Sequence, residues 1–150
     1  MKLCLLAAIL PLFVLQSCKT ATERWLGGLT NFKELDDNAL SLQVMKMQLQ
    51  PTDTTSFGYQ VRIYPSKTWL ENQGPGQAVD FLYHTDSSFC IRAGKACISP
   101  VIVQPVNNGI ANCYEYLLYF HVEKEIRLKN IELVYADRFI NKKQYALKLN

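Results

Sequence analysis

Residues 57–64, FGYQVRIY, decide the fold class of this chain. Every second residue of the stretch is large and apolar, namely Phe57, Tyr59, Val61 and Ile63. Successive side chains of a β-strand point to opposite faces of the sheet, so this period of two predicts a strand with one buried face. The other residues of the stretch are mostly polar or small, as expected on the opposite face.

Several segments around this stretch also predict strands. Residues 79–84 (VDFLYH) and 145–149 (YALKL) repeat the alternation, so we expect a strand at each. Residues 40–49 change the parity of their apolar positions, which predicts a β-bulge near Val44. Residues 114–122 are apolar on both faces, as is typical of a central strand.

Turn residues separate these segments at regular intervals. They are Pro65-Ser66, Gly74-Pro75-Gly76, Asn107-Asn108-Gly109 and Asn141-Lys142-Lys143. No segment predicts a helix long enough to form part of the core. About eight short strands with regular turns predict an all-β fold, an antiparallel β-sandwich of the immunoglobulin or transthyretin type, over residues 39–150.

The first residues of the chain have the features of an export signal. Lys2 is followed by an apolar run over residues 3–15, which Pro11 interrupts. A helix needs about 20 residues to cross ~30 Å of hydrocarbon, so this run is too short to span a membrane. We therefore expect residues 1–17 to be a cleaved signal peptide.

Residues 15–18, LQSC, resemble the bacterial lipobox, although Gln16 departs from the commonest residue types at its position. The resemblance implies that Cys18 carries a diacylglyceryl group and an acyl chain and that residues 18–38 are a lipidated tether. Such chains hold a protein on a bilayer because each buried CH2 contributes ~0.8 kcal/mol. An ordinary secretory signal cut near Ser17 is the alternative. Lys19 stands where Asp would favour the inner membrane of Gram-negative bacteria, so the resemblance favours the outer membrane.

Cys90, Cys97 and Cys113 remain after the signal and the lipidated cysteine, and export permits disulfides. Gly94 lies between two short apolar runs, which predicts a hairpin. If its loop is Ala93-Gly94, Cys90 lies directly opposite Cys97, so we favour a Cys90–Cys97 disulfide. A Cys97–Cys113 disulfide and a zinc site are the alternatives, but no CxxC pair and no matching histidine spacing supports a metal.

Neither charge nor motifs indicate catalysis or nucleic-acid binding. The chain has 16 basic and 13 acidic residues and no polybasic cluster, which argues against a nucleic-acid partner. Residues 84–88, HTDSS, contain the residue types of a hydrolase triad, but neighbours in a strand or turn point in different directions. We therefore expect no enzyme, no metal and no cofactor apart from the lipid on Cys18.

Two loops are candidates for binding a partner. The loop over residues 65–77 is long for a sandwich and carries Trp69 and Leu70. Trp69 either anchors an interface or folds back over one end of the sandwich. Ile110 is the second candidate, because an apolar residue beside the turn at Asn107 is unusual.

The lipobox, the size, the strand pattern and the long loop together resemble small outer-membrane lipoproteins of Gram-negative bacteria, in a style like that of the Bacteroidota. More specifically, they resemble the accessory lipoproteins of type VI secretion systems. The resemblance implies a scaffold that is held in the membrane by its lipid and docks envelope proteins. A glycan-binding surface lipoprotein, and an inhibitor of a protease or lysozyme, are the alternatives.

Overall fold

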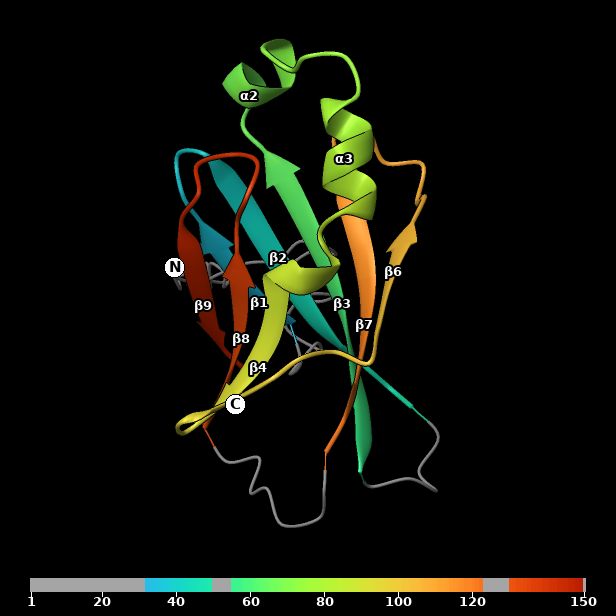
Figure 1. Cartoon of the computed structure of the whole chain (residues 1–150), viewed down its shortest axis with the longest axis vertical. Helices are drawn as coiled ribbons and strands as arrows, with labels where there is room; N and C mark the ends of the chain where they lie inside the picture. Colours follow the sequence, from blue (N-terminus) through green and yellow to red (C-terminus); the bar gives the residue numbers. More distant parts are fainter. Residues whose placement is uncertain (1–31, 50–54, 123–129, 150) are drawn as a thin grey trace, which may run out of the picture.

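A computed structural model of the chain describes residues 32–49, 55–122 and 130–149. In these residues two antiparallel sheets face each other (Figure 1), which confirms the predicted all-β sandwich. The five-stranded sheet has the order β1-β2-β3-β7-β6, and the four-stranded sheet has the order β5-β4-β8-β9. The signal, Cys18 and the first part of the expected tether lie outside the described residues.

The strands are β1 (Phe32–Asp36), β2 (Leu40–Met47), β3 (Ser56–Pro65), β4 (Phe89–Ala93), β5 (Ala96–Ile98), β6 (Ile102–Val106), β7 (Tyr114–His121), β8 (Ile131–Ala136) and β9 (Gln144–Lys148). The helical elements are α2 (Lys67–Glu71), α3 (Gln77–Tyr83) and the 3-10 helix η1 (Asp86–Ser88). No helix among the described residues is long and apolar enough to cross a membrane.

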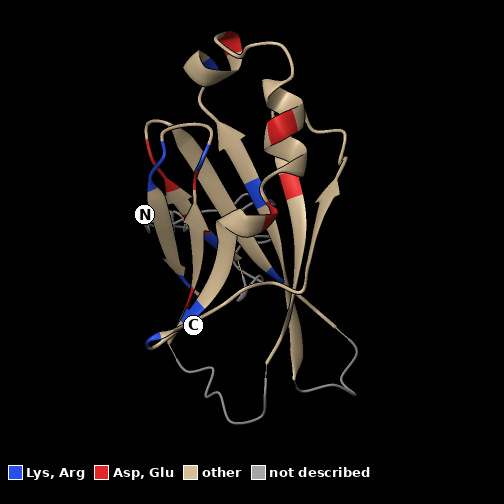
Figure 2. Ribbon diagram, viewed as in Figure 1, with Lys and Arg blue, Asp and Glu red and all other residues tan. Residues whose placement is uncertain are grey.

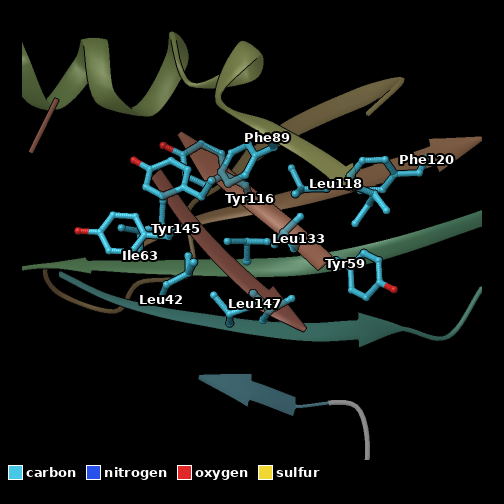
Figure 3. Close-up of a cluster of buried hydrophobic side chains, with 14 of the residues drawn as sticks. Leu42, Tyr59, Ile63, Phe89, Tyr116, Leu118, Phe120, Leu133, Tyr145 and Leu147 are labelled. Carbon is cyan, nitrogen blue, oxygen red and sulfur yellow. The ribbon is translucent and has the colours of Figure 1, made fainter. Parts of the chain in front are cut away.

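The core lies between the two sheets, where alternate residues of the inner strands meet (Figure 3). The expected strand at residues 57–64 is β3, and its apolar side chains are all buried. The predicted central strand is β7, which lies between β3 and β6. Burial of this alternating set is the main source of stability, at about 25 cal/mol per Å² of apolar surface.

The predicted bulge near Val44 is wrong. β2 pairs with β3 in one uninterrupted register, from Leu40 opposite Pro65 to Met47 opposite Gly58. Met45 therefore points to the outer face of the sheet, and so does Met47. The change in parity came from an outer face that is itself apolar, not from an extra residue in the strand.

The predicted strand at residues 79–84 is also wrong, because this segment forms helix α3. Only Phe81 of its apolar residues is fully buried, whereas Val79 is 56% and Tyr83 62% exposed. The helix begins after Gly76, whose φ of 85° lies in the left-handed region that glycine tolerates. One buried side chain in a seven-residue helix leaves no helical period in the sequence.

Two boundaries also differ from the sequence-based expectation. The expected tether extended to residue 38, but Phe32–Asp36 forms β1, an edge strand that pairs with β2. The hairpin turn is one residue later than predicted, since Ala93 pairs with Ala96 and Gly94 has a φ of 61°. The structure places a disulfide between Cys90 and Cys97, with Cα atoms 5.8 Å apart, and leaves Cys113 as a free cysteine.

The two ends of the sandwich differ. At one end lie α2 and α3, together with the β6–β7 and β8–β9 connections (Figure 1); we call this the helical end. β1 begins toward the opposite end, because Phe32 pairs with Met45 and β2 continues from there to Met47. We call that opposite end the tether end, since β1 runs away from it.

Candidate functional site

An aromatic cluster centred on Phe81 packs between the helices of the helical end and the sandwich. The ring of Phe81 lies 4.4 Å from Tyr114, 5.4 Å from Trp69 and 5.5 Å from Phe139, measured between ring centroids. The indole Nε1 of Trp69 donates a hydrogen bond to the carbonyl oxygen of Phe139, 3.2 Å away. Of the two interpretations of Trp69, the structure therefore supports the one in which it covers the end of the sandwich.

Helix α2 is short and depends on this cluster. The hydroxyl of Ser66 caps its first turn by accepting a hydrogen bond from the backbone N–H of Trp69, 3.4 Å away. No residue of α2 is fully buried, and Leu70 is half-buried like Trp69. A helix of this length is marginal by itself, so the packing of Trp69 holds α2 in place.

Helix α3 is fixed to the core by a buried polar contact. The hydroxyl of Tyr116 donates a 2.7 Å hydrogen bond to the carbonyl oxygen of Phe81, and the Thr85 hydroxyl donates to the same oxygen. Burial raises the pKa of Tyr116 well above its usual value, so the donating proton is retained. Phe81 thus faces inward, and Val79 and Tyr83 lie one helical turn apart on the exposed side.

The β6–β7 connection presents Ile110 to solvent. Ile110 is 44% exposed, and its backbone N–H donates a 2.8 Å hydrogen bond to the side-chain oxygen of Asn108. The side-chain nitrogen of Asn108 in turn donates to a carboxylate oxygen of Glu115, 2.7 Å away. The position of Ile110 is therefore linked through one asparagine to a residue of β7.

Glu115 is a buried carboxylate on the outer face of the five-stranded sheet. Gln60 Nε2 and Arg62 Nε of β3 each donate to it at 2.6 Å, from the strand that pairs with β7. Figure 2 shows this acidic segment of β7 beside the basic segment of β3. Both carboxylate oxygens are thus hydrogen-bonded, which is the condition for burying a charge at tolerable cost.

The electrostatic balance at Glu115 favours the ionised form. Burial by itself raises the pKa of this carboxyl, since it penalises charge. The hydrogen bonds from Asn108, Arg62 and Gln60 act in the opposite direction and outweigh burial, so the pKa lies below its usual range. The loop that carries Ile110 is therefore tied to a carboxylate that remains charged at neutral pH.

The β8–β9 connection is organised by another buried carboxylate, Asp137. Its oxygens accept hydrogen bonds from the backbone N–H groups of Phe139, Ile140, Asn141 and Lys142 and from the hydroxyl of Tyr135. This arrangement sets Phe139 against Phe81 and places its carbonyl oxygen where Trp69 donates. The carboxylate thus has a structural role in the helical end.

The residues that resemble a hydrolase triad diverge in the structure. His84 Nδ1 lies 3.3 Å from the carboxylate of Asp80, while the hydroxyl of Thr85 faces Phe81. Ser87 accepts a hydrogen bond from Arg138. No cluster of three metal-ligating side chains occurs in the described ranges. What the helical end offers chemically is an exposed apolar surface on a fixed support.

Comparison with known proteins gives no relative: no protein-family model, no curated protein and no solved structure matches this chain. The interpretation of the helical end therefore depends on its own geometry.

The sequence-based candidates identified only part of this surface. Ile110 is exposed as expected, whereas Trp69 and Leu70 are half-buried. Val79 and Tyr83 were missed because their segment was interpreted as a strand. The signals that could have found them were Pro75-Gly76 just before the segment and the Asp80–His84 pair at helical spacing.

Proposed function

We propose that this chain is a lipid-anchored lipoprotein of the cell envelope, in the outer membrane, that docks an envelope protein through its helical end. Its role would be structural, in a membrane-associated assembly such as the membrane complex of a type VI secretion system. In this proposal Cys18 supplies the anchor, and Val79, Tyr83 and Ile110, which we call the docking residues, supply the contact.

The main support is the way in which Ile110 is displayed. When an exposed apolar side chain in a loop binds a partner, the loop usually loses conformational entropy, and this loss weakens binding. Here the loop is already held by Asn108, which joins the Ile110 backbone to the buried Glu115. A pre-ordered apolar contact of this kind suits recognition of another protein surface.

The position of β1 is consistent with this role. β1 runs from Phe32 toward the helical end, where Val79, Tyr83 and Ile110 lie. With a lipid on Cys18, the docking residues would be on the side of the domain that is remote from the attachment point. A partner in the envelope could then reach them without competing with the bilayer.

The glycan-binding alternative gains less support. It needs Trp69 with Tyr64 or Tyr83 as a flat, exposed platform for sugar rings. The Trp69 ring instead packs inward, tilted 56° to Phe81 at a centroid distance of 5.4 Å. Tyr83 is exposed, but Trp69 is committed to covering the sandwich.

The docking proposal is tested by recovery of a partner from native membranes. The full-length lipoprotein carrying Ile110→Ala or Tyr83→Ala should recover an envelope protein several-fold less well than wild type. Val101→Ala is the matched control, because Val101 is 65% exposed and apolar but lies outside the helical end. No recovered envelope protein, or equal recovery by wild type and both docking variants, would contradict the proposal.

The anchor is tested separately. Cys18→Ser should abolish lipid labelling and move the protein to the soluble fraction of the envelope. Unchanged lipid labelling with full retention in the membrane would show that Cys18 is not the anchor.

A further inference from the structure

The outer face of the five-stranded sheet is divided along its strands. Toward the helical end, a charged row crosses four strands in register: Glu34, Gln43, Arg62 and Glu115. Gln43 donates to Glu34 at 2.8 Å, and Arg62 donates to Glu115 at 2.6 Å. Toward the tether end the side chains on the same face are mostly apolar.

The apolar half of this face, which we call the apolar sheet face, consists of Phe32, Met45, Met47, Leu117, Tyr119 and Ile102. Five strands contribute to the two rows in which these residues lie, and the same rows hold Gly58, the exposed Gln104 and Gln60, whose amide is turned toward Glu115. Ile102 is 52% exposed and the other residues of the apolar sheet face are half-buried. The solvent face of an antiparallel sheet is normally polar, so an apolar surface here needs a cover.

Contacts at Gly58 show that the row of Met47 and Tyr119 is continuous. Gly58 lies opposite Met47 on one side and opposite Tyr119 on the other. A Cβ atom at Gly58 would collide with the terminal methyl of Met47, and it would lie 3.6 Å from Cδ1 of Tyr119. In this row the two side chains thus approach the glycine from both sides, and no polar side chain lies between β2 and β7.

The course of the chain indicates what covers the apolar sheet face. Phe32 belongs to this face, and residues 19–31 are the only ones between it and Cys18. Thirteen residues reach about 45 Å at most when fully extended. A lipid on Cys18 would therefore keep this face within one tether length of the bilayer, while the charged row lies farther along the strands.

We propose that the apolar sheet face rests on the surface of the bilayer in which Cys18 is anchored. The inference depends on the proposed lipid anchor and adds the orientation of the domain to it. The rings of Phe32 and Tyr119 are of the kind favoured at the membrane–water boundary, and Met45, Met47 and Leu117 supply apolar contact. The bilayer would cover the tether end and leave the docking residues accessible.

Site-specific photo-crosslinking of the full-length lipidated protein, in vesicles of phosphatidylethanolamine and phosphatidylglycerol with labelled acyl chains, tests this orientation. A photoreactive residue at Met45 or Leu117 should give several-fold more lipid adduct than one at Ala146. Ala146 is the matched control, because it is exposed on the outer face of the four-stranded sheet, opposite Val134. These positions are outward-facing, so the replacements leave the core unchanged.

Every other outcome overturns the inference. Equal lipid labelling at Met45, Leu117 and Ala146 would mean that the domain has no preferred face toward the bilayer. Crosslinks from Met45 or Leu117 to a second copy, or to residues 19–31 of the same chain, would identify a different cover. Lipid labelling of Cys18 is measured in the same samples, so a protein that is anchored but not oriented is distinguished from one that is not anchored.

Discussion

At the scale of single residues, Glu115 links the core sheet to the loop of the helical end that carries Ile110. It accepts hydrogen bonds from Gln60, Arg62 and Asn108, and only Asn108 belongs to the loop that carries Ile110. Its side chain is 5% exposed, whereas that of Arg62 is 33% exposed. Arg62 can therefore be solvated if the pair is broken, but the groups around Glu115 cannot rearrange as easily.

Glu115→Gln should lower the free energy of unfolding by about 1–3 kcal/mol, because charge-assisted hydrogen bonds become neutral ones and the new amide brings donors that face donors. Urea denaturation at neutral pH measures the change. Glu34→Gln is the control, since Glu34 is exposed and accepts from Gln43 on the same face of the sheet. A Glu115 variant as stable as the Glu34 variant would show that the buried network contributes nothing.

The difference in unfolding free energy between wild type and Glu115→Gln should depend on pH. The pKa of Glu115 is lowered in the folded state from its usual 4.5, so its contribution is present above that value and is lost as pH falls through the folded pKa. The stability difference between wild type and Glu115→Gln should therefore shrink below about pH 4.5. The pKa of Asp37 is also lowered, mainly by the backbone N–H of Ala39, but this effect is common to both proteins and cancels.

At the scale of elements, the sequence predicted the interior strands of the five-stranded sheet and missed its edges, although it also predicted β9, an edge strand of the other sheet. β3 was predicted from its alternation, and β7 from apolar side chains on both faces, because each has neighbours on both sides. β1 and β6 were missed because neither strand contains a fully buried residue, so their apolar alternation is weak. β6 also contains Pro105, which an edge strand tolerates.

The candidate site was harder to predict than the fold, because it depends on contacts between distant segments. Nothing local indicates that Trp69 would donate to the carbonyl of Phe139, or that Asn108 would reach Glu115. α3 was missed because its apolar residues alternate with a period of two over Val79–Tyr83. Tertiary packing of Phe81 decided the conformation of that segment against the local pattern.

The dependence of α2 on Trp69 gives a prediction at this scale. Trp69→Ala removes the contacts with Phe81 and Tyr114 and the hydrogen bond to Phe139, and should cost about 2–4 kcal/mol of stability. Amide exchange in residues 67–71 should accelerate more than in β3, because no residue of the helix is fully buried and the Trp69 ring makes its main packing contacts.

Trp69→Phe keeps much of the ring packing and is the control for the hydrogen bond. Uniform acceleration of exchange over the whole domain in Trp69→Ala, with α2 no more affected than β3, would mean that the helix does not depend on this ring. Because Trp69 has this structural role, its loss would weaken partner binding indirectly, so Ile110 and Tyr83 are the better probes of docking.

At the scale of the whole molecule, the two sheets are joined at one edge by a polar link. Lys143 donates to Asp37 at 3.2 Å and Tyr145 donates to the same oxygen at 3.3 Å, so the β8–β9 connection meets the β1–β2 turn. β1 is therefore an integral part of the sandwich and not the end of a loose tether. If Cys18 is lipidated, the membrane anchor is therefore connected to β1, a strand that is paired with β2.

The Cys90–Cys97 disulfide acts on the same scale, because a crosslink stabilises mainly by restricting the unfolded chain. For a loop this short, the double variant Cys90→Ala, Cys97→Ala should lose about 2–3 kcal/mol of unfolding free energy. Urea denaturation with and without reductant measures it: reductant should destabilise wild type to the level of the double variant and leave the double variant unchanged. Cys113→Ala should respond to reductant as wild type does. If Cys113→Ala removed the sensitivity to reductant instead, Cys113 would be part of the crosslink and the Cys90–Cys97 pairing would be wrong.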